Sequence, residues 1–166
     1  MKTIKEHAVA YIHSGKSIFP CGKNKQPLID WKKYQTTKST VEDVNNWWTE
    51  FPDANIAIIT GKISGVSVID CDLGSDYTQF PETITVKTGS GGYHLYYLYQ
   101  EGLGNKVGFL PHVDIRSDGG YVVAYPSVTE DKYENGILKK KGGKYELIRG
   151  SGEMRFSDFP EDLLEE

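Results

Sequence analysis

Hydrophobic positions near the start of the chain follow a helical spacing and then lose regularity. Apolar side chains recur every three or four positions through residues 3–14 and Gly15 follows them, so this segment is predicted to be an amphipathic helix. A short strand is expected at Ser17–Phe19. The stretch Pro20–Asp30 mixes Pro, Gly, Asn and Lys, which is typical of a loop.

A second helix is predicted from a capping motif. The sequence Ser-Thr-Val-Glu at residues 39–42 has the form of a capping box, in which Ser39 and Glu42 satisfy the first free amides of a helix. This helix is expected to run to about Glu50. Its buried face would consist of Val44, Trp47 and Trp48.

From Asn55 onward the pattern changes to short runs rich in Val, Ile, Thr and Tyr, with Gly or Pro between most of them. Such runs are typical of strands, and we expect them to form one sheet. Lys144–Ile148 is a candidate for a final strand. The six main predicted strands are Ile56–Ile59, Val66–Asp70, Thr83–Val86, Tyr93–Leu98, Val113–Arg116 and Tyr121–Ala124.

Length and composition agree with a single core. A chain of 166 residues, 38% of them hydrophobic, can build one sizeable core and is short for two. The helices and strands together indicate an α+β fold. We therefore predict one compact domain over residues 1–150, followed by an acidic tail or linker over residues 151–166.

The cysteines and the N-terminal segment bear on location. Cys21 and Cys71 are too few for a disulfide framework or a zinc site, so a reducing cytoplasm is expected. Charged residues interrupt the apolar positions of residues 1–16, so neither secretion nor membrane insertion is predicted.

The net charge of -4 argues against DNA binding by bulk electrostatics, because phosphate binding relies on Lys and Arg. The charge is unevenly distributed, however, since residues 158–166 hold five acids and no Lys or Arg. Lysine clusters elsewhere could contact a nucleic-acid backbone or a triphosphate, or could form a solvated surface. They are Lys23 and Lys25, Lys32 and Lys33, and Lys139, Lys140, Lys141 and Lys144.

Two aspartates end an apolar strand within residues 65–72. Strand side chains alternate, so Asp70 and Asp72 leave the same face. Their charges repel by roughly 4 kcal/mol at an effective dielectric of about 20, and a divalent cation between them would offset this repulsion. Carboxylate oxygens favour Mg²⁺ or Mn²⁺ over zinc. The alternative is a pair of solvated aspartates at a strand end.

A glycine-rich turn at residues 88–92 precedes a strand that begins near His94. Glycines let the backbone come close to phosphate oxygens, and a histidine at this place can reach a triphosphate. The alternative is an ordinary hairpin turn followed by a half-buried histidine. The pattern matches neither the Walker nor the Rossmann fingerprint, because no helix follows it.

Asp114 and Arg116 share one face of a predicted strand. Such a pair is most often a plain ion pair. Beside two metal ions, Asp114 would instead be a third carboxylate ligand and Arg116 a bidentate clamp for phosphate. Three carboxylates, a histidine, an arginine and a glycine-rich turn are the parts needed to align a nucleoside triphosphate and a 3′-hydroxyl around two ions.

In their order along the chain, these residues resemble the bifunctional primase-polymerase (Prim-Pol) domain of the archaeo-eukaryotic primase superfamily, found in replication proteins of plasmids, phages and mobile elements. The resemblance spans residue 5 to about residue 150. It is carried by Gly15–Pro20, Lys25–Leu28 with Trp31, Trp47-Trp48, Asn55–Gly61, Val68–Asp72, Gly92–His94, Val113-Asp114 with Arg116, and Gly119–Ser127.

The resemblance implies an archaeo-eukaryotic-primase-like α+β fold. In it, a catalytic sheet similar to an RNA-recognition fold joins an N-terminal αβ unit, with the site in the cleft between them. It implies that Asp70, Asp72 and Asp114 hold two Mg²⁺ or Mn²⁺ ions. The residues expected to face the incoming dNTP or NTP are Ser90, His94 and Arg116. Lys23 or Lys25 is expected to assist them, and Lys25 is the one predicted as a nucleotide-binding residue.

The implied activity is template-directed primase or polymerase chemistry on a DNA template and primer. Some relatives carry a zinc-binding insertion or continue into a helicase or an accessory helical domain. This sequence lacks the cysteines for the insertion, so extension is expected more firmly than unaided primer initiation. Two other functions fit the same residues: a metal-dependent phosphodiesterase or nuclease, and a non-catalytic module that binds single-stranded nucleic acid or nucleotides.

Overall fold

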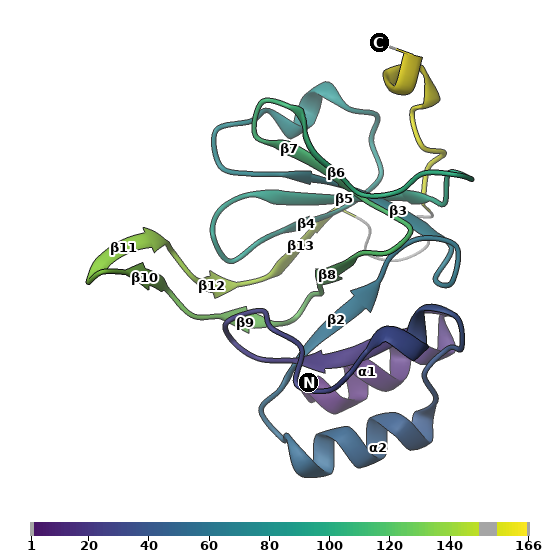
Figure 1. Ribbon diagram of the computed structural model, residues 1–166, viewed down its shortest axis with the longest axis vertical. Helices are drawn as coiled ribbons and strands as arrows, with labels where there is room; N and C mark the ends of the chain where they lie inside the picture. Colours follow the sequence, from purple (N-terminus) through teal and green to yellow (C-terminus); the bar gives the residue numbers. More distant parts are fainter. Residues whose placement is uncertain (1, 150–155, 166) are drawn as a thin grey trace.

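The computed structural model describes residues 2–149 and 156–165, which form two main antiparallel sheets, two small two-stranded sheets and a pair of α-helices (Figure 1). The predicted α+β class is confirmed. The smaller sheet has the order β1-β2-β8 and lies beside both helices in the lower part of Figure 1. Its elements are α1 (Ile4–His13), β1 (Ile18–Cys21), α2 (Val41–Glu50), β2 (Asn55–Ile59) and β8 (Tyr121–Val123).

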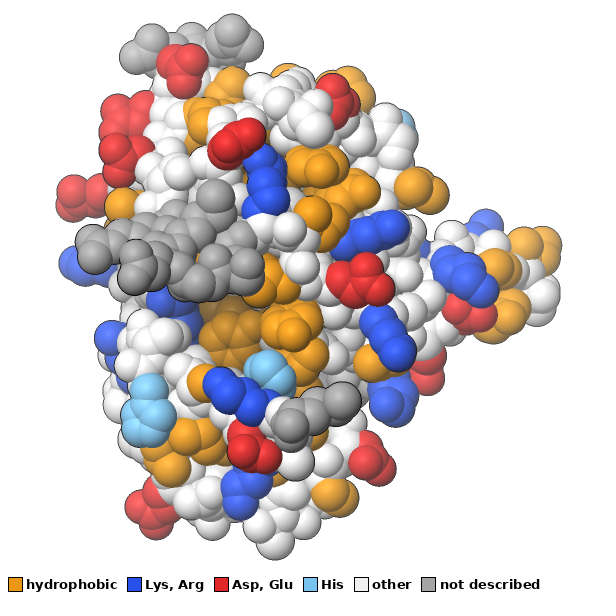
Figure 2. Space-filling model, turned by 180° about the vertical axis from the view of Figure 1, so that it is seen from behind, with side chains coloured by type: hydrophobic (Ala, Val, Ile, Leu, Met, Phe, Trp, Pro, Cys, Tyr) orange, Lys and Arg blue, Asp and Glu red, His pale blue; other side chains and the backbone are white. Residues whose placement is uncertain are grey.

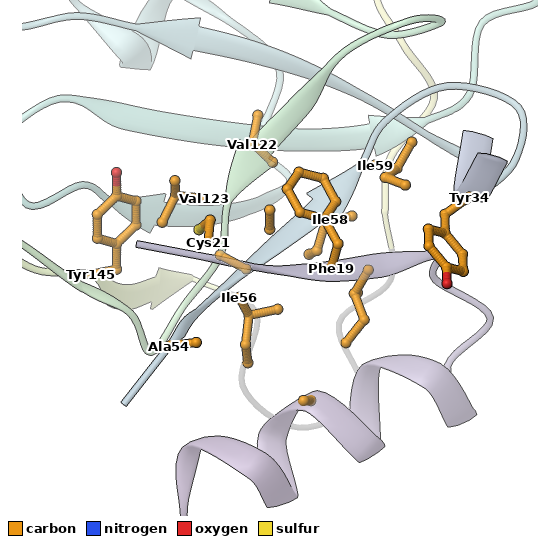
Figure 3. Close-up of a cluster of buried hydrophobic side chains, with 14 of the residues drawn as sticks. Phe19, Cys21, Tyr34, Ala54, Ile56, Ile58, Ile59, Val122, Val123 and Tyr145 are labelled. Atoms are coloured by element: carbon orange, nitrogen blue, oxygen red, sulfur yellow. The ribbon is translucent and has the colours of Figure 1, made fainter. Parts of the chain in front are cut away.

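The small sheet and the helices enclose the main hydrophobic core. Every residue of β1 and β2 is buried, which explains why these strands read as continuous apolar runs rather than as alternating ones. Figure 3 shows part of this cluster, including Phe19 of β1, Ile56 of β2 and Val122 of β8. The small sheet is therefore held from both sides by apolar contacts.

The capping box predicted for Ser39 and Glu42 is wrong by one residue. Thr40 caps α2: its hydroxyl accepts from the Asp43 N–H at 3.1 Å, and the Asp43 carboxylate accepts from the Thr40 N–H at 2.9 Å. Ser39 is buried instead, and its hydroxyl accepts from the Ile18 N–H of β1 at 2.8 Å. The pairing of Ser39 with β1 moves the cap to the next hydroxyl residue.

The larger sheet has six strands in the order β13-β4-β5-β3-β7-β6, all paired antiparallel. The prediction of one sheet is therefore wrong, because β2 and β8 pair with each other and with β1 in the small sheet. The large sheet consists of β3 (Val66–Cys71), β4 (Ile84–Lys87), β5 (Tyr93–Leu98), β6 (Lys106–Leu110), β7 (Val113–Arg116) and β13 (Glu146–Arg149).

Loops and the C-terminal segment cover the face of the large sheet that carries Ile69 and Tyr97. Both side chains belong to a second buried cluster with Phe80, Leu103 and Phe159. The short 3-10 helices η2 (Tyr77–Gln79) and η3 (Glu161–Glu165) flank this cluster, and Leu163 and Leu164 pack against it. The predicted boundary between residues 150 and 151 lies outside the described residues.

A β-hairpin that the sequence pattern did not predict projects from the body at the left of Figure 1. Its strands are β10 (Lys132–Glu134) and β11 (Ile137–Lys140). Below it, β9 (Val128–Thr129) pairs with β12 (Gly143–Lys144). The candidate strand at Lys144–Ile148 is split between β12 and β13.

Two further observations concern the cysteines and the helices of the described residues. Cys21 and Cys71 are both free and buried, so they form no disulfide. The helices of the described segments are too short or too polar for any of them to span a membrane.

Candidate active site

A cavity of about 410 Å³ lies where the small sheet, the large sheet and the root of the hairpin meet. Its volume is within the range usual for small-molecule sites. The large sheet and the segments next to it contribute Asp70, Asp72, His94, Asn105, Asp114 and Arg116. The other walls include Lys25, Gln26, Trp31, Tyr121, Lys140 and Tyr145.

Strand register brings the central acidic and basic groups together. In the antiparallel pairings of β3, Asp70 lies opposite His94 of β5 on one side and opposite Asp114 of β7 on the other. Directly opposed residues place their side chains on the same face, with Cβ atoms about 4.5–5.5 Å apart. Asp72 lies just beyond the end of β3, where its N–H donates to the carbonyl of His112 at 2.8 Å.

Asp70 and Asp114 are similarly enclosed, with 22% and 21% of their side chains exposed, whereas Asp72 is 49% exposed. Asp70 Oδ1 lies 3.3 Å from His94 Nε2, and Asp70 Oδ2 lies 4.0 Å from Arg116 Nε. Burial alone raises the pKa of Asp70, but His94, Arg116 and Lys140 outweigh burial and hold this pKa below its ordinary value. Asp70 is therefore a carboxylate at neutral pH and a potential ligand for a cation.

The other two carboxylates are also engaged by donors. Asp114 Oδ1 accepts the N–H of Gly108 at 2.7 Å, and Asp114 Oδ2 accepts from Arg116 Nη2 at 3.3 Å. Gly108 lies at the irregularity in the pairing of β6 with β7 and has a φ of 65°, which favours glycine. Asp72 Oδ1 pairs with Lys140 Nζ at 3.3 Å.

One family model matches this chain. Its description is "Bifunctional DNA primase/polymerase, N-terminal", and it covers residues 8–161 of 166. The chain belongs to this Prim-Pol family. The resemblance found in the sequence is thereby confirmed, and it indicates a nucleotidyltransferase-type enzyme whose substrates are nucleic acid and nucleotides. No curated protein matches the chain.

The Prim-Pol donor set suits a divalent ion, although it is not closed around one. Among residues 2–149 and 156–165, no three His, Cys, Asp or Glu groups lie close enough to hold a metal as they stand. Asp72 and Asp114 face Lys140 and Arg116 instead. All three aspartates nevertheless line one cavity, and their oxygen atoms are the ligand type that Mg²⁺ and Mn²⁺ prefer.

The glycine-rich turn of this Prim-Pol domain is a tight β-hairpin turn between β4 and β5. The Thr88 N–H donates to the Gly92 carbonyl at 2.9 Å. A Cβ on Gly89 would collide with the backbone of Gly143, and one on Gly92 with the backbone of Cys71. Close contact with the neighbouring backbones therefore explains why glycine occupies both positions.

Ser90 lies at the tip of that turn, outside the main cavity. It lines a neighbouring hollow of about 300 Å³ together with Asp72 and Lys140. Its hydroxyl is 3.3 Å from the hydroxyl of Thr88. The structure therefore brings Ser90 near Asp72, and separates it from His94 and Arg116, which line the main cavity.

Of the two candidate lysines, Lys25 lines the main cavity and Lys23 lines an adjoining hollow. Lys25 has a φ of 71°, and its carbonyl accepts the hydroxyl of Tyr121 at 3.0 Å. Burial lowers the pKa of Lys25 and Lys140 lowers it further, while Asp70 and Asp72 act in the opposite direction. Tyr121 thus helps to fix the loop that carries Lys25 toward the carboxylates.

Several lining residues were not predicted as site residues. Lys140 appeared only within a basic cluster, and Trp31 only within a motif. Trp31 and Tyr121 contact each other edge to face, with ring centroids 5.2 Å apart. Their aromatic character was a usable signal, but sequence alone does not show that a loop after β1 and the strand β8 meet at one cavity.

Proposed function

We propose that this Prim-Pol domain joins nucleotides on a DNA template. It would transfer the nucleotidyl group of a dNTP or NTP to a 3′-hydroxyl, with two Mg²⁺ or Mn²⁺ ions on Asp70, Asp72 and Asp114. One observation carries the proposal: the three carboxylates open into the same cavity as Arg116 and Lys25. Anionic metal ligands beside cationic groups are what a metal-bound triphosphate requires.

The ions, when bound, supply Lewis acidity for the attacking hydroxyl and positive charge for the leaving pyrophosphate. The protein's own side chains position the substrate and neutralise the charge of its phosphates. Asp70 lies near the end of β3, between His94 of β5 and Asp114 of β7, so it could contribute to either ion. Asp114, which pairs with Arg116 in this structure, would hold an ion together with Asp70 and Asp72, and the planar guanidinium of Arg116 would bind two phosphate oxygens in parallel.

Further residues complete the substrate contacts. His94 lines the cavity and directs its Nε2 toward Asp70 Oδ1, 3.3 Å away, whereas its Nδ1 is buried. Nε2 is therefore the His94 nitrogen that would donate to a phosphate oxygen. Lys25 approaches from the opposite wall. Ser90 would contact only the distal end of a triphosphate that extends past Asp72.

For the wider setting we propose replication of a plasmid, phage or mobile element, with a helicase or an accessory helical domain as the partner. The cytoplasm stays a prediction from the sequence.

A primed DNA template incubated with Mn²⁺ and labelled dNTPs or NTPs tests the activity. We expect the wild-type protein to lengthen the primer, and Asp70→Asn to lose about a hundredfold or more in rate, because an isosteric amide cannot replace the charged ligand. Asp53→Asn, at an exposed turn after α2, is the matched control and should keep full activity.

Two results would count against the proposal. Shortened oligonucleotides that depend on Asp70 would indicate a nuclease or phosphodiesterase. Binding of nucleic acid without incorporation, unaffected by Asp70→Asn, would indicate a binding module.

A further inference from the structure

The β10–β11 hairpin presents apolar side chains to solvent. Tyr133 is 59% exposed, Ile137 63% and Leu138 46%. Tyr133 and Leu138 are cross-strand partners, so they lie on the same face of the hairpin. An isolated two-stranded hairpin is at best marginally stable in water, and these side chains add nothing to the domain's core. Exposed apolar side chains in such a place are typical of a binding surface.

The root of the hairpin is fixed although its tip is exposed. The Gly142 N–H donates to the Asp131 carboxylate at 2.8 Å, and the Glu130 N–H donates to the Lys23 carbonyl at 2.9 Å. At the tip, Asn135 and Gly136 have φ values of 53° and 77°, as a tight two-residue turn requires. The hairpin thus projects from a defined place on the body (Figure 1), and Lys140 at the end of β11 lines the cavity.

Basic side chains accompany the apolar ones. Residues 130–144 contain five lysines and three acids, although the whole chain has a net charge of -4. Figure 2 shows blue and orange side chains next to one another on the projecting hairpin. This combination suits a ligand that has both phosphates and apolar surfaces.

A basic path connects the hairpin with the candidate active site. A hollow of about 490 Å³ separates the hairpin from the loop after β1, and Lys23, Lys132 and Lys141 are among its lining residues. Lys25 and Lys140 line this hollow and the main cavity alike. A strand lying along the hairpin would therefore be led toward the carboxylates.

We propose that the β10–β11 hairpin binds single-stranded DNA and guides the template strand to the cavity. The lysines contact phosphates, and Tyr133, with Leu138 beside it, packs against an unstacked base. A single strand fits better than a duplex, because base pairing and stacking hide the base faces that Tyr133 would contact. Binding of DNA stands on the hairpin's own residues, whereas the role as template rests on the function proposed above.

Fluorescence anisotropy with labelled oligo(dT), without nucleotide or divalent metal, tests the binding step. We expect Tyr133→Ser to weaken binding about fivefold or more, as loss of a stacking contact does. Lys139→Gln with Lys141→Gln should lower the slope of log affinity against log salt by about 1.4, since each phosphate contact to a single strand contributes about 0.7. Lys2→Gln with Lys5→Gln, a pair on and before α1, is the matched control and should bind as the wild type does.

Unchanged affinity and salt slope in both hairpin variants would overturn the proposal. Equal affinity of the wild type for oligo(dT) and for a blunt duplex would also overturn it. So would hairpin variants that lose self-association in sedimentation but keep DNA binding, because the apolar tip would then be a protein interface. Thermal melts followed by circular dichroism verify that the variants are folded. All five substituted residues are exposed, so folding is expected to persist: they are Tyr133, Lys139, Lys141, Lys2 and Lys5.

The two proposals fail separately. Asp70→Asn should keep oligo(dT) binding while it loses incorporation. Hairpin-dependent binding by a wild-type protein that incorporates nothing contradicts the proposed function alone. If the wild type incorporates nucleotides, and neither Tyr133→Ser nor the lysine double substitution changes DNA affinity or primer extension, only the role of the hairpin is contradicted.

Discussion

At the scale of single residues, Arg116 is placed to hold two carboxylates at once. Its Nε lies 4.0 Å from Asp70 Oδ2, and its Nη2 lies 3.3 Å from Asp114 Oδ2. A planar guanidinium can keep both contacts, and it can also bind two oxygens of one phosphate. A lysine ammonium offers a single point charge and can do neither in the same geometry. The shape of Arg116 therefore matters as much as its charge.

Arg116→Lys should raise the KM for the incoming nucleotide about tenfold, which corresponds to about 1.4 kcal/mol of binding. The kcat should change much less, because a contact made equally in the ground state and the transition state affects KM alone. Primer extension at varied dNTP concentration measures both constants. Arg149→Lys is the matched control, since Arg149 lies on β13 beside Glu82. An unchanged KM in Arg116→Lys would remove Arg116 from the triphosphate contacts.

Local spacing was enough to predict some neighbours of the candidate site and not others. Asp114 and Arg116 were expected on one face because strand side chains alternate, and their ion pair agrees. That Asp70 lies opposite both His94 and Asp114 depends on β3 pairing with β5 and β7. Such register joins segments far apart in the sequence, and the hydrophobic pattern of a single strand does not encode its partner.

At the scale of elements, the start of α2 allows a direct comparison of two adjacent hydroxyl groups. Thr40→Ala removes an exposed N-cap and should lower the free energy of unfolding by about 1 kcal/mol. Ser39→Ala leaves the N–H of Ile18 without its partner in the core, and should cost about 1–3 kcal/mol. Urea denaturation of both variants measures the difference. A larger loss for Thr40→Ala would show that the cap outweighs the buried contact.

Elements with a clear hydrophobic pattern were predicted well, and the others were missed. Tyr93–Leu98 and Val113–Arg116 were predicted with the bounds of β5 and β7. The strand β6 has Gly108 in its middle and an irregular register, so it lacks an alternating pattern. The β10–β11 hairpin has no buried face, yet Asn135-Gly136 is a strong signal for a two-residue hairpin turn and could have revealed it.

At the scale of the whole molecule, the structure separates charge within a chain whose net charge is small. The large sheet supplies the carboxylates, whereas the loop after β1 and the hairpin supply Lys25 and Lys140. The ion pair between Lys140 and Asp72 connects the hairpin root with the end of β3. A cation on Asp72 would release Lys140 toward an incoming phosphate, so metal and substrate binding should support each other.

Metal binding should therefore stabilise the folded domain as a whole. At an Mn²⁺ concentration about a hundredfold above Kd, the free energy of unfolding should rise by about 2.7 kcal/mol. For a domain of this size that corresponds to an increase in Tm of about 5–10 °C, measurable by thermal melts with and without EDTA. Asp70→Asn and Asp114→Asn can themselves change the Tm of the metal-free protein, because each removes a charge from the site. The informative quantity is the shift that Mn²⁺ causes within each variant, which should be small in both and unchanged in Asp53→Asn. An equal Mn²⁺ shift in all four proteins would place the ion elsewhere and leave the carboxylates without their proposed role.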